Sequence, residues 1–389
     1  MSAPLKILHV AETAQGGVGS YIEEVVALQA ARHGTGSLCV VLPREHAQHF
    51  KRLPAEALHL YDIAGSGRLR TMLRMAVLTL KLVRRWRPDV VHVHSTYAGF
   101  VLRPLLAALP QRPRIVYCAH GWAFDREASP RVNRLVAAIE RVWSRWCDAV
   151  VCISHHDTKS ALRIGVPAQR LVTVSNGIAD VSVEASVVTS SRARWPEHTL
   201  RVLFVGRLDR QKGVDVLYAA MQRLGAQASA LVVGSAVVEA DNTLATPANV
   251  QVTGWLSRDQ IAALYAAAQV LVVPSRWEGF GLVAVEAMRA GRAVIASRVG
   301  GLPEVVEHGV TGLLVEPDDA AALAGALAQL SAEQLQAMGA AGRLRFERLF
   351  HVQRVCDELD ALYQRLVLPH QSAAPGGLAA GLSERTPRS

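Results

Sequence analysis

The sequence has no long hydrophobic run, although half of its 389 residues are hydrophobic. A helix that crosses a bilayer needs about 20 consecutive apolar residues, and no segment reaches that length. The opening residues MSAPLKILHVAE lead directly into a strand-like segment, without the charged and then apolar pattern of a secretory leader. We therefore expect a cytoplasmic protein without a transmembrane helix.

Cysteine and aromatic residues are also scarce. The five cysteines are odd in number and show no C-x-x-C spacing, which disfavours a disulfide framework and a zinc knuckle. Aromatic residues seldom alternate with basic ones, so no nucleic-acid partner is expected. His92 and His94 form an H-x-H pair, but no carboxylate accompanies them at ligand spacing, and core packing is the favoured interpretation. We expect no metal and no cofactor.

Acidic residues are too few in the first half of the chain to balance the basic ones. Residues 1–180 carry a net charge of +10 and residues 181–389 a net charge of −1. Such a basic half is typical of proteins that bind nucleic acid, an anionic bilayer or a phosphorylated substrate.

The segment 68–88 contains seven basic residues and no acidic one. At about 100° per residue it predicts an amphipathic helix with two opposite faces. The basic stripe holds Arg70, Arg74, Lys81, Arg84 and Arg85, and the apolar face holds Met72, Met75, Leu82, Val83 and Trp86. The stripe is either the solvated face of an ordinary helix or a surface for phosphate or membrane. The regional charge favours an anionic membrane.

Short apolar runs alternate with helix-length segments along nearly the whole chain. Six runs in the first half are rich in Val and Ile and predict buried parallel strands: LKILHVAE, GSLCVVLP, PDVVHVHS, RIVYCAH, AVVCIS and RLVTVSN. Six more follow in the second half: LRVLFVGR, SALVVGS, NVQVTGW, QVLVVPS, AVIASR and TGLLVEP. The pattern predicts an α/β protein with two doubly wound domains, whose ligands bind at the carboxyl ends of the strands.

A change of composition separates the two sets of strands. Residues 181–198 lose helical periodicity and collect Ser, Thr and Pro, which is typical of a linker. We expect an N-terminal domain at 1–180, a second domain at 199–350 and an amphipathic closing helix at 351–368. Residues 369–389 are rich in Pro, Gly and Ser and predict a disordered tail.

The stretch PSRWEGFGLVAVEAM, residues 274–288, predicts an anion-binding loop between a strand and a helix. Gly279 and Gly281 bracket a tight turn, and the N–H groups of Phe280, Gly281 and Leu282 lie at the helix start, where they favour a phosphate. Glu286 is placed for ribose hydroxyls and Glu278 for a sugar. An ordinary helix start with an exposed glutamate explains the stretch, taken alone, about equally well.

A second stretch, VLFVGRLDRQKGVDVL at residues 202–217, repeats the strand–loop–helix pattern. Gly206 permits a close approach, and Arg207 and Lys212 offer two cations that suit a diphosphate. Either cation alone is more often a solvated surface charge. Two such loops at strand ends of one domain are harder to explain in that way.

Together the two stretches resemble the retaining nucleotide-sugar glycosyltransferases of family four, over about residues 5–368. The resemblance implies the GT-B fold, in which two Rossmann-like domains face each other across a deep cleft. It implies that Arg207 and Lys212 neutralise the donor diphosphate. It further implies that Glu286 binds the nucleotide ribose and that Glu278 contacts the transferred sugar.

Two stretches of the first half extend the resemblance. HVAETAQGGVGSYIEEVV resembles the first loop of the family, where the backbone at Gly16 and Gly17 approaches the donor phosphates and the acceptor. The residues after the glycines, VGSY, depart from the usual pattern. VYCAHGWAF places His120 at a strand end, where it resembles the cleft histidine of the family beside the transferred sugar.

The expected function is transfer of a hexosyl unit from a nucleotide diphosphate sugar, with retained configuration and without a metal. The expected acceptor is a polyprenyl-diphosphate-linked saccharide in surface polysaccharide or lipopolysaccharide assembly, at the inner face of the cytoplasmic membrane. Three alternatives stay open. A glycoside hydrolase would use Glu278 and Glu286 as acid and base. A nucleotide-sugar epimerase would share the architecture, and a sensor would bind the donor without turnover.

Overall fold

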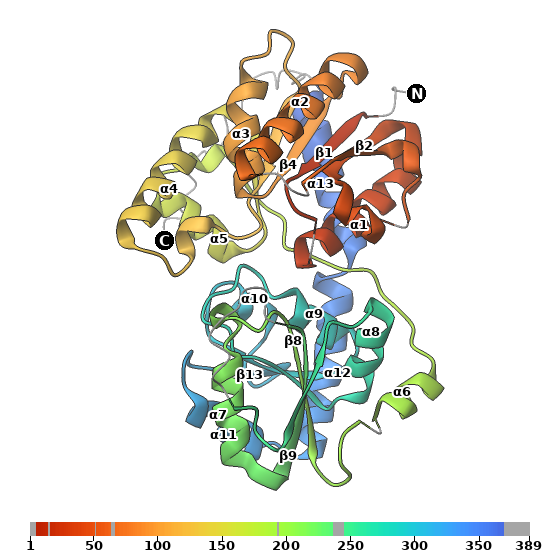
Figure 1. Cartoon of the computed structure of the whole chain (residues 1–389), viewed down its shortest axis with the longest axis vertical. Coiled ribbons are helices and arrows are strands. Elements are labelled where there is room, and N and C mark those ends of the chain that lie inside the picture. Colours follow the sequence, from red (N-terminus) through yellow and green to blue (C-terminus); the bar gives the residue numbers. More distant parts are fainter. Residues whose placement is uncertain are drawn as a thin grey trace, which may run out of the picture.

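The computed structural model describes residues 5–14, 16–50, 52–63, 67–192, 194–235 and 245–368. They form two α/β domains, one above the other in Figure 1, and each domain contains one parallel sheet. The predicted fold class is confirmed. The tail predicted at 369–389 lies outside the described residues.

The N-terminal sheet has seven strands in the order β3-β2-β1-β4-β5-β6-β7. Its strands are β1 Ile7–Ala11, β2 Leu38–Pro43, β3 Leu58–Tyr61, β4 Val90–His94, β5 Arg114–Cys118, β6 Ala149–Cys152 and β7 Leu171–Thr173. All five residues of the interior strand β1 are buried, as a strand covered on both faces requires. Six of these strands were predicted. The seventh, β3, was not predicted: it is a four-residue edge strand, LHLY, that is mostly half-buried and whose apolar residues are interrupted by a histidine.

Helices cover both faces of this sheet. They are α1 Gly16–His33, α2 Arg68–Trp86, α3 Thr96–Ala107, α4 Pro130–Trp143, α5 His155–Arg163 and, from the end of the chain, α13 Val352–Val367. The buried residues of α1 and α13 share one hydrophobic cluster, and those of α2 and α3 share another cluster on the opposite face. The predicted closing helix is therefore α13, which returns to pack against α1 of the N-terminal domain (Figure 1).

The C-terminal sheet has six strands in the order β10-β9-β8-β11-β12-β13. Its strands are β8 Leu200–Val205, β9 Ala228–Val233, β10 Val250–Gly254, β11 Val270–Val273, β12 Ala293–Ser297 and β13 Gly312–Val315. Its helices are α7 Val214–Leu224, α8 Arg258–Ala267, α9 Leu282–Arg289, α10 Leu302–Val305, α11 Ala320–Ala328 and α12 Ala332–Leu349. All six predicted strands are present. No described helix is both long and apolar enough to span a bilayer.

The chain crosses between the domains twice, and the two crossings are hydrogen-bonded to each other. Ile178 N–H donates to the carbonyl of Phe350 over 2.9 Å, and Val352 N–H donates to the carbonyl of Ile178 over 3.0 Å. The first crossing continues through the predicted linker 181–198, which contains a short helix that the sequence pattern did not indicate, α6 Ala185–Arg192. This helix packs against α8, so tertiary contact overrides the weak helical pattern of its Ser- and Thr-rich sequence.

Candidate functional site

The loop after β11 leaves a helix start open to a ligand. Gly281 adopts a left-handed conformation with φ 95° and is the N-cap of α9, and no side chain in the described part of the chain caps the helix. The first N–H groups of α9 are therefore available to an anion, as the sequence predicts. Phe280 is buried beneath the loop, so of this residue only the backbone can serve a ligand.

A glycine pair from another loop supports the Glu278 loop. Gly301 N–H donates to the carbonyl of Glu278 over 3.2 Å. A Cβ atom on Gly300, whose φ is 54°, would lie 1.7 Å from that carbonyl oxygen. The sequence VGGLPE contains the signal for this contact, but the pair was not recognised in the sequence. Its function is to let two backbones approach closely and fix the position of Glu278.

The two predicted cations both lie beside the Glu278 loop. Lys212 Nζ forms an ion pair with Glu278 Oε2 over 2.5 Å. Arg207 donates to Gln211 Oε1 over 2.7 Å, and Gln211 Nε2 donates to the carbonyl of Trp277 over 3.1 Å. Gln211 thus connects the cationic loop to the Glu278 loop, a role that no sequence motif indicated.

Glu286 lies one turn into α9 and is partly buried. Its Oε2 accepts a hydrogen bond from the hydroxyl of Tyr265 over 2.8 Å. Burial raises the pKa of Glu286, while the positive charge of Arg289 and the bond from Tyr265 act against that rise. Tyr265 is a single tyrosine within α8, so nothing in the sequence indicated that it would orient this carboxylate.

The N-terminal domain meets these loops through glycine. A Cβ atom on Gly17 would lie 3.3 Å from Cδ1 of Leu282, at the start of α9, and Gly16 has a φ of 60°. Deeper in the cleft, a Cβ atom on Gly279 would lie 3.2 Å from the Cα of Gly121. The structure therefore brings the first glycine loop and the loop after β5 against the predicted donor loop.

His120 precedes Gly121 and has a φ of 57°, a left-handed conformation that is uncommon for a residue with a side chain. Its Nε2 lies 2.9 Å from Nδ1 of His94. Burial lowers the pKa of His120 to about 3, so the ring is neutral near neutral pH. Backbone strain of this kind is concentrated at functional sites.

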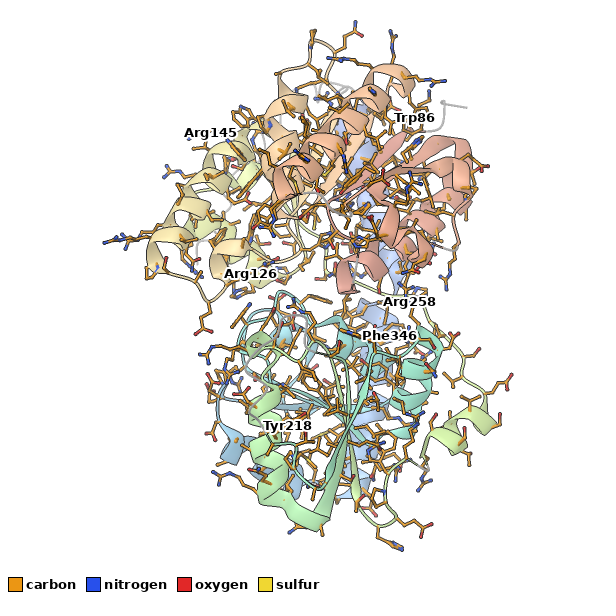
Figure 2. All side chains as sticks on the ribbon, viewed as in Figure 1. Trp86, Arg126, Arg145, Tyr218, Arg258 and Phe346 are labelled. Carbon is orange, nitrogen blue, oxygen red and sulfur yellow. The ribbon has the colours of Figure 1, made fainter. Side chains whose placement is uncertain are left out.

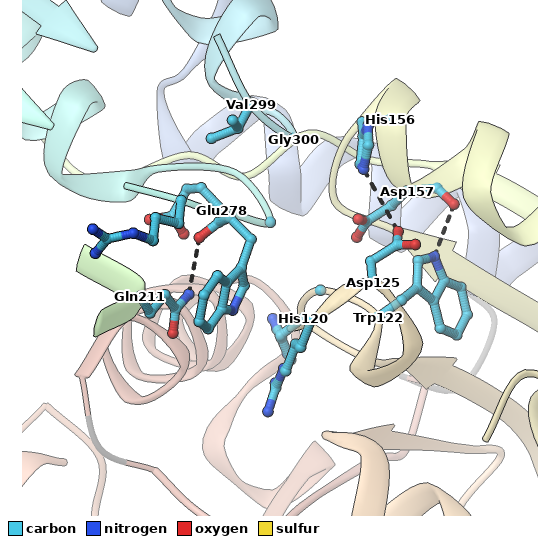
Figure 3. A pocket seen from close by; sticks show the side chains of 14 residues that line it. His120, Trp122, Asp125, His156, Asp157, Gln211, Glu278, Val299 and Gly300 are labelled. Atoms are coloured by element: carbon cyan, nitrogen blue, oxygen red, sulfur yellow. Dashed lines mark hydrogen bonds and ion pairs between the residues drawn. The ribbon is translucent and has the colours of Figure 1, made fainter. Parts of the chain in front are cut away.

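His120 and Glu278 line one pocket of about 340 Å³ between the domains (Figure 3). That volume suits a small ligand. The opposite wall carries Asp125, Asp157 and His156. The two aspartates were not singled out in the sequence, and the His155–His156 pair was interpreted there as core packing or loop capping. Asp125 lies 3.5 Å from the His156 ring and raises the pKa of that histidine, whereas burial raises the pKa of Asp157 to about 7. Arg207, Lys212 and Glu286 are not among the residues that line this pocket.

Charged groups hold the domains together around the pocket. The carboxylate of Glu304 accepts hydrogen bonds of 2.7 and 2.6 Å from the backbone N–H groups of His155 and His156, at the N-terminus of α5. Arg258, which reaches the domain boundary in Figure 2, pairs with Glu23 of α1. These contacts come from opposite domains, so they stabilise the observed arrangement of the two domains.

Three buried histidines lie together below the cleft. Ligand atoms of His9, His92 and His94 all lie within 4.8 Å of one another. The ring nitrogens of His9 already pair with His94 and Gln29, and Nδ1 of His92 pairs with the hydroxyl of Tyr363. The expected core packing therefore agrees with these contacts, and the expectation of no metal stays a prediction.

The support of the Glu278 loop yields a prediction. Gly300→Ala should lower kcat/KM of the expected sugar transfer by about a hundredfold, because displacing a reacting group by about 1 Å has an effect of that size. Gly309→Ala is the matched control, since Gly309 also has a positive φ of 81° but no atom lies near its Cβ position. Steady-state kinetics of both variants measure this effect. Wild-type turnover in Gly300→Ala would contradict the role of the glycine pair in positioning Glu278.

Comparison with known proteins identifies the family. A profile described as "Glycosyl transferase 4-like domain" matches residues 16–177, and one described as "Glycosyl transferases group 1" matches residues 199–333. The chain is 30% identical to glycogen synthase of Mycobacterium tuberculosis in an alignment of 304 residues that covers 72% of this chain and 69% of the relative. It is 27% identical over 322 residues to an uncharacterized 41.2 kDa protein in the cps region of Klebsiella pneumoniae, over 81% of this chain and 87% of that protein.

Solved structures share the fold. Sucrose-phosphate synthase from Thermosynechococcus elongatus aligns with a TM-score of 0.77 at 24% identity, over 93% of this chain and 99% of its own. Anabaena HepE in complex with UDP-glucose aligns with a TM-score of 0.78 at 20% identity, over 93% of this chain and all of its own. The chain therefore belongs to the group 1 glycosyltransferases of GT-B fold, and it is a glycosyltransferase that uses a nucleotide-sugar donor.

Proposed function

We propose that this glycosyltransferase moves a hexosyl unit from a nucleotide diphosphate sugar to a lipid-linked saccharide, with retained anomeric configuration. The observation that carries the proposal is the meeting of Lys212 and Glu278, 2.5 Å apart, beside the uncapped start of α9. Cations and free amides there suit a diphosphate, and a carboxylate beside them suits sugar hydroxyls.

In the proposed reaction the diphosphate is the leaving group. The bond between the anomeric carbon and the phosphate oxygen breaks, and a new bond forms to the acceptor oxygen on the same face of the sugar. The acceptor proton passes to the departing phosphate. Arg207, Lys212 and the first amides of α9 stabilise the charge that develops on the phosphate oxygens. Lys212 has three N–H donors, so it can bind a phosphate oxygen while it holds Glu278.

The alternative functions have less support. Nothing in the comparisons supports an epimerase or a sensor. A hydrolase that used Glu278 and Glu286 would have no need of the adjoining cations Arg207 and Lys212. The comparisons and the presence of the two cations both favour sugar transfer over these alternatives.

The acceptor is proposed from charge and from one relative. The relative in the Klebsiella cps region supports a role in surface polysaccharide assembly. A polyprenyl-diphosphate-linked saccharide would combine a phosphorylated substrate with an anionic membrane surface, and both suit the basic N-terminal domain. We propose that the protein acts at the inner face of the cytoplasmic membrane.

The outer surface of α2 supports that location. Met72, Met75 and Val83 are buried, as predicted, and the basic stripe is exposed. Between the basic residues, Leu69 is 83% exposed and Leu73 is 63% exposed. An exposed apolar row among arginines is typical of a helix that lies at a membrane interface.

Helix α4 adds a second surface of the same kind. It contacts α3, which in turn contacts α2, and Val136 and Ala137 of α4 pack on the hydrophobic cluster that α2 and α3 share. Its exposed apolar side chains include Leu135 at 62% exposure, and exposed arginines accompany them: Arg131, Arg134, Arg141 and Arg145. Arg145 lies at the outer edge of the upper domain in Figure 2. Together α2 and α4 form a broad basic and apolar surface.

The role of the two cations leads to a mutational prediction. Arg207→Ala and Lys212→Ala should each remove about 2 to 4 kcal/mol of transition-state stabilisation, as the loss of one preorganised donor does. Arg223→Ala, an exposed arginine on α7 of the same domain, is the control and should keep wild-type kcat/KM. Equal turnover of Lys212→Ala and the control would refute the diphosphate assignment.

A chelation experiment tests the proposed independence from metal. Protein cations and helix amides do the work that a divalent ion would otherwise do on the diphosphate, so turnover should continue in EDTA. The measurement compares initial rates with and without chelator after dialysis. Complete loss of activity that Mg²⁺ or Mn²⁺ restores would overturn this part of the proposal.

The membrane surface is tested by liposome sedimentation. Changing Lys81, Arg84 and Arg85 to Gln should weaken binding to anionic vesicles by about 3 kcal/mol, at about 1 kcal/mol for each basic residue near the surface. The matched control changes Arg223, Arg298 and Arg348 to Gln, which removes the same charge from the exposed surface of the C-terminal domain. Binding that ignores lipid charge, salt and the first set of changes would exclude this surface.

A further inference from the structure

A continuous row of hydrogen-bonded side chains runs from the cleft to α13. Nε2 of His120 lies 2.9 Å from Nδ1 of His94. Nε2 of His94 lies 3.0 Å from Nδ1 of His9, and Nε2 of His9 lies 3.0 Å from Oε1 of Gln29. Gln29 Nε2 then donates to Asp360 over 3.2 Å. The row connects β5, β4, β1, α1 and α13, and its residues between His120 and Asp360 are fully buried.

The far end of the row determines its direction. Arg32 pairs with the Asp360 carboxylate over 2.9 Å, so Asp360 is ionised there and can only accept hydrogen bonds. Gln29 must turn its NH₂ group toward Asp360, which leaves its carbonyl oxygen for His9. Nε2 of His9 must therefore carry the proton.

Each ring in the row carries one proton only. Burial lowers the pKa of His9 to about 4 and that of His120 to about 3, and it holds the pKa of His94 well below its usual range. A neutral imidazole that donates from Nε2 accepts at Nδ1. His9 thus accepts from Nε2–H of His94, and His94 accepts from Nε2–H of His120. Nδ1 of His120 is left without a proton.

We propose that Gln29, His9 and His94 are positioning residues that fix the tautomer of His120 and leave its Nδ1 as the hydrogen-bond acceptor for a sugar hydroxyl in the cleft. Among the described residues none hydrogen-bonds to that Nδ1, and His120 lines the pocket with Glu278. We call Gln29, His9 and His94 the histidine relay. Only the role of His120 beside a sugar rests on the proposed function. The tautomer follows from the contacts of the free protein.

The fixed tautomer of His120 suits the binding of a sugar hydroxyl. A hydroxyl can donate one hydrogen bond or accept from a ring N–H, whereas a bare ring nitrogen can only accept, so the fixed tautomer determines that the hydroxyl is the donor. Fixing the tautomer in advance spares the cost of reorganising the ring when the sugar binds. Because Asp360 lies on α13, this helix also contributes to fixing the tautomer of His120 in the cleft.

Nitrogen NMR of the full chain, with labelled histidine and no ligand, tests the relay directly. Ring signals distinguish a protonated nitrogen from a bare one, and the His120→Gln variant assigns the His120 signal. The wild-type protein should show His120 protonated at Nε2 and bare at Nδ1. A proton on Nδ1 would overturn the proposal. It is also the result that a metal ion on His9, His92 and His94 would produce, because His94 would then donate from Nδ1 to His120.

Variants at the far end of the row test its effect on catalysis. Gln29→Met removes the acceptor for His9, so a second tautomer of His120 should appear and kcat should fall on the order of tenfold, the size of one hydrogen bond. The dissociation constant of the free nucleoside diphosphate should stay unchanged. Tyr21→Phe is the matched control, because its ring lies edge-on against His120, with centroids 5.0 Å apart, and its buried hydroxyl has no hydrogen-bond partner among the described residues. It should keep the wild-type tautomer and kcat.

If Gln29→Met does not fold, Asp360→Asn serves instead, since an amide lets Gln29 turn either way and should also mix the tautomers. Unchanged NMR and kcat in a folded far-end variant would refute the relay. Failure of the proposed function would look different: the wild-type protein would transfer no hexose from any UDP-, GDP- or ADP-hexose, while the His120 signal still showed a bare Nδ1.

Discussion

The close approach of two backbones, at Gly121 and Gly279, sets the geometry of the cleft. A Cβ atom on Gly279 would lie 3.2 Å from the Cα of Gly121, so even a methyl group there would require a shift of a few tenths of an ångström, and a Cβ atom on Gly121 would already be in contact with Gly279 at 3.5 Å. His120 and Glu278 are the chain neighbours of these glycines, so the contact brings both onto one pocket. Gly17 against Leu282 repeats the arrangement at the start of α9. Glycine at these positions allows the facing carboxyl ends of the two parallel sheets to approach this closely.

Charge then divides the site into two parts. Lys212 and Arg207 lie with the free amides of α9 on the side of the C-terminal domain, whereas the pocket wall of the N-terminal domain carries Asp125 and Asp157. A cationic region suits the diphosphate of a donor, and carboxylates suit the hydroxyls of sugars. His120 stands between them as a neutral ring, kept neutral by burial. The distribution fits transfer of a sugar between two bound substrates.

Much of the fold could be predicted from the sequence, because parallel strands buried on both faces leave long apolar runs. The edge strand β3 left no such run. The loops around Arg207, Lys212 and Glu278 could be predicted because each motif is continuous in the chain. The partners of those motifs could not be predicted. Gln211, Tyr265 and the histidine relay act through contacts between separate elements, and His9 meets His94 only because β1 pairs with β4.

The central claim is that the closed cleft binds a nucleotide diphosphate sugar and activates it for transfer. The most direct measurement incubates the full chain with UDP-, GDP- and ADP-hexoses and follows both Tm and release of nucleoside diphosphate. One donor should raise Tm, as any ligand that binds only the folded state does, and should slowly lose its hexose to water when no acceptor is present. If no nucleotide sugar raises Tm and an unactivated glycoside is hydrolysed instead, the account is contradicted.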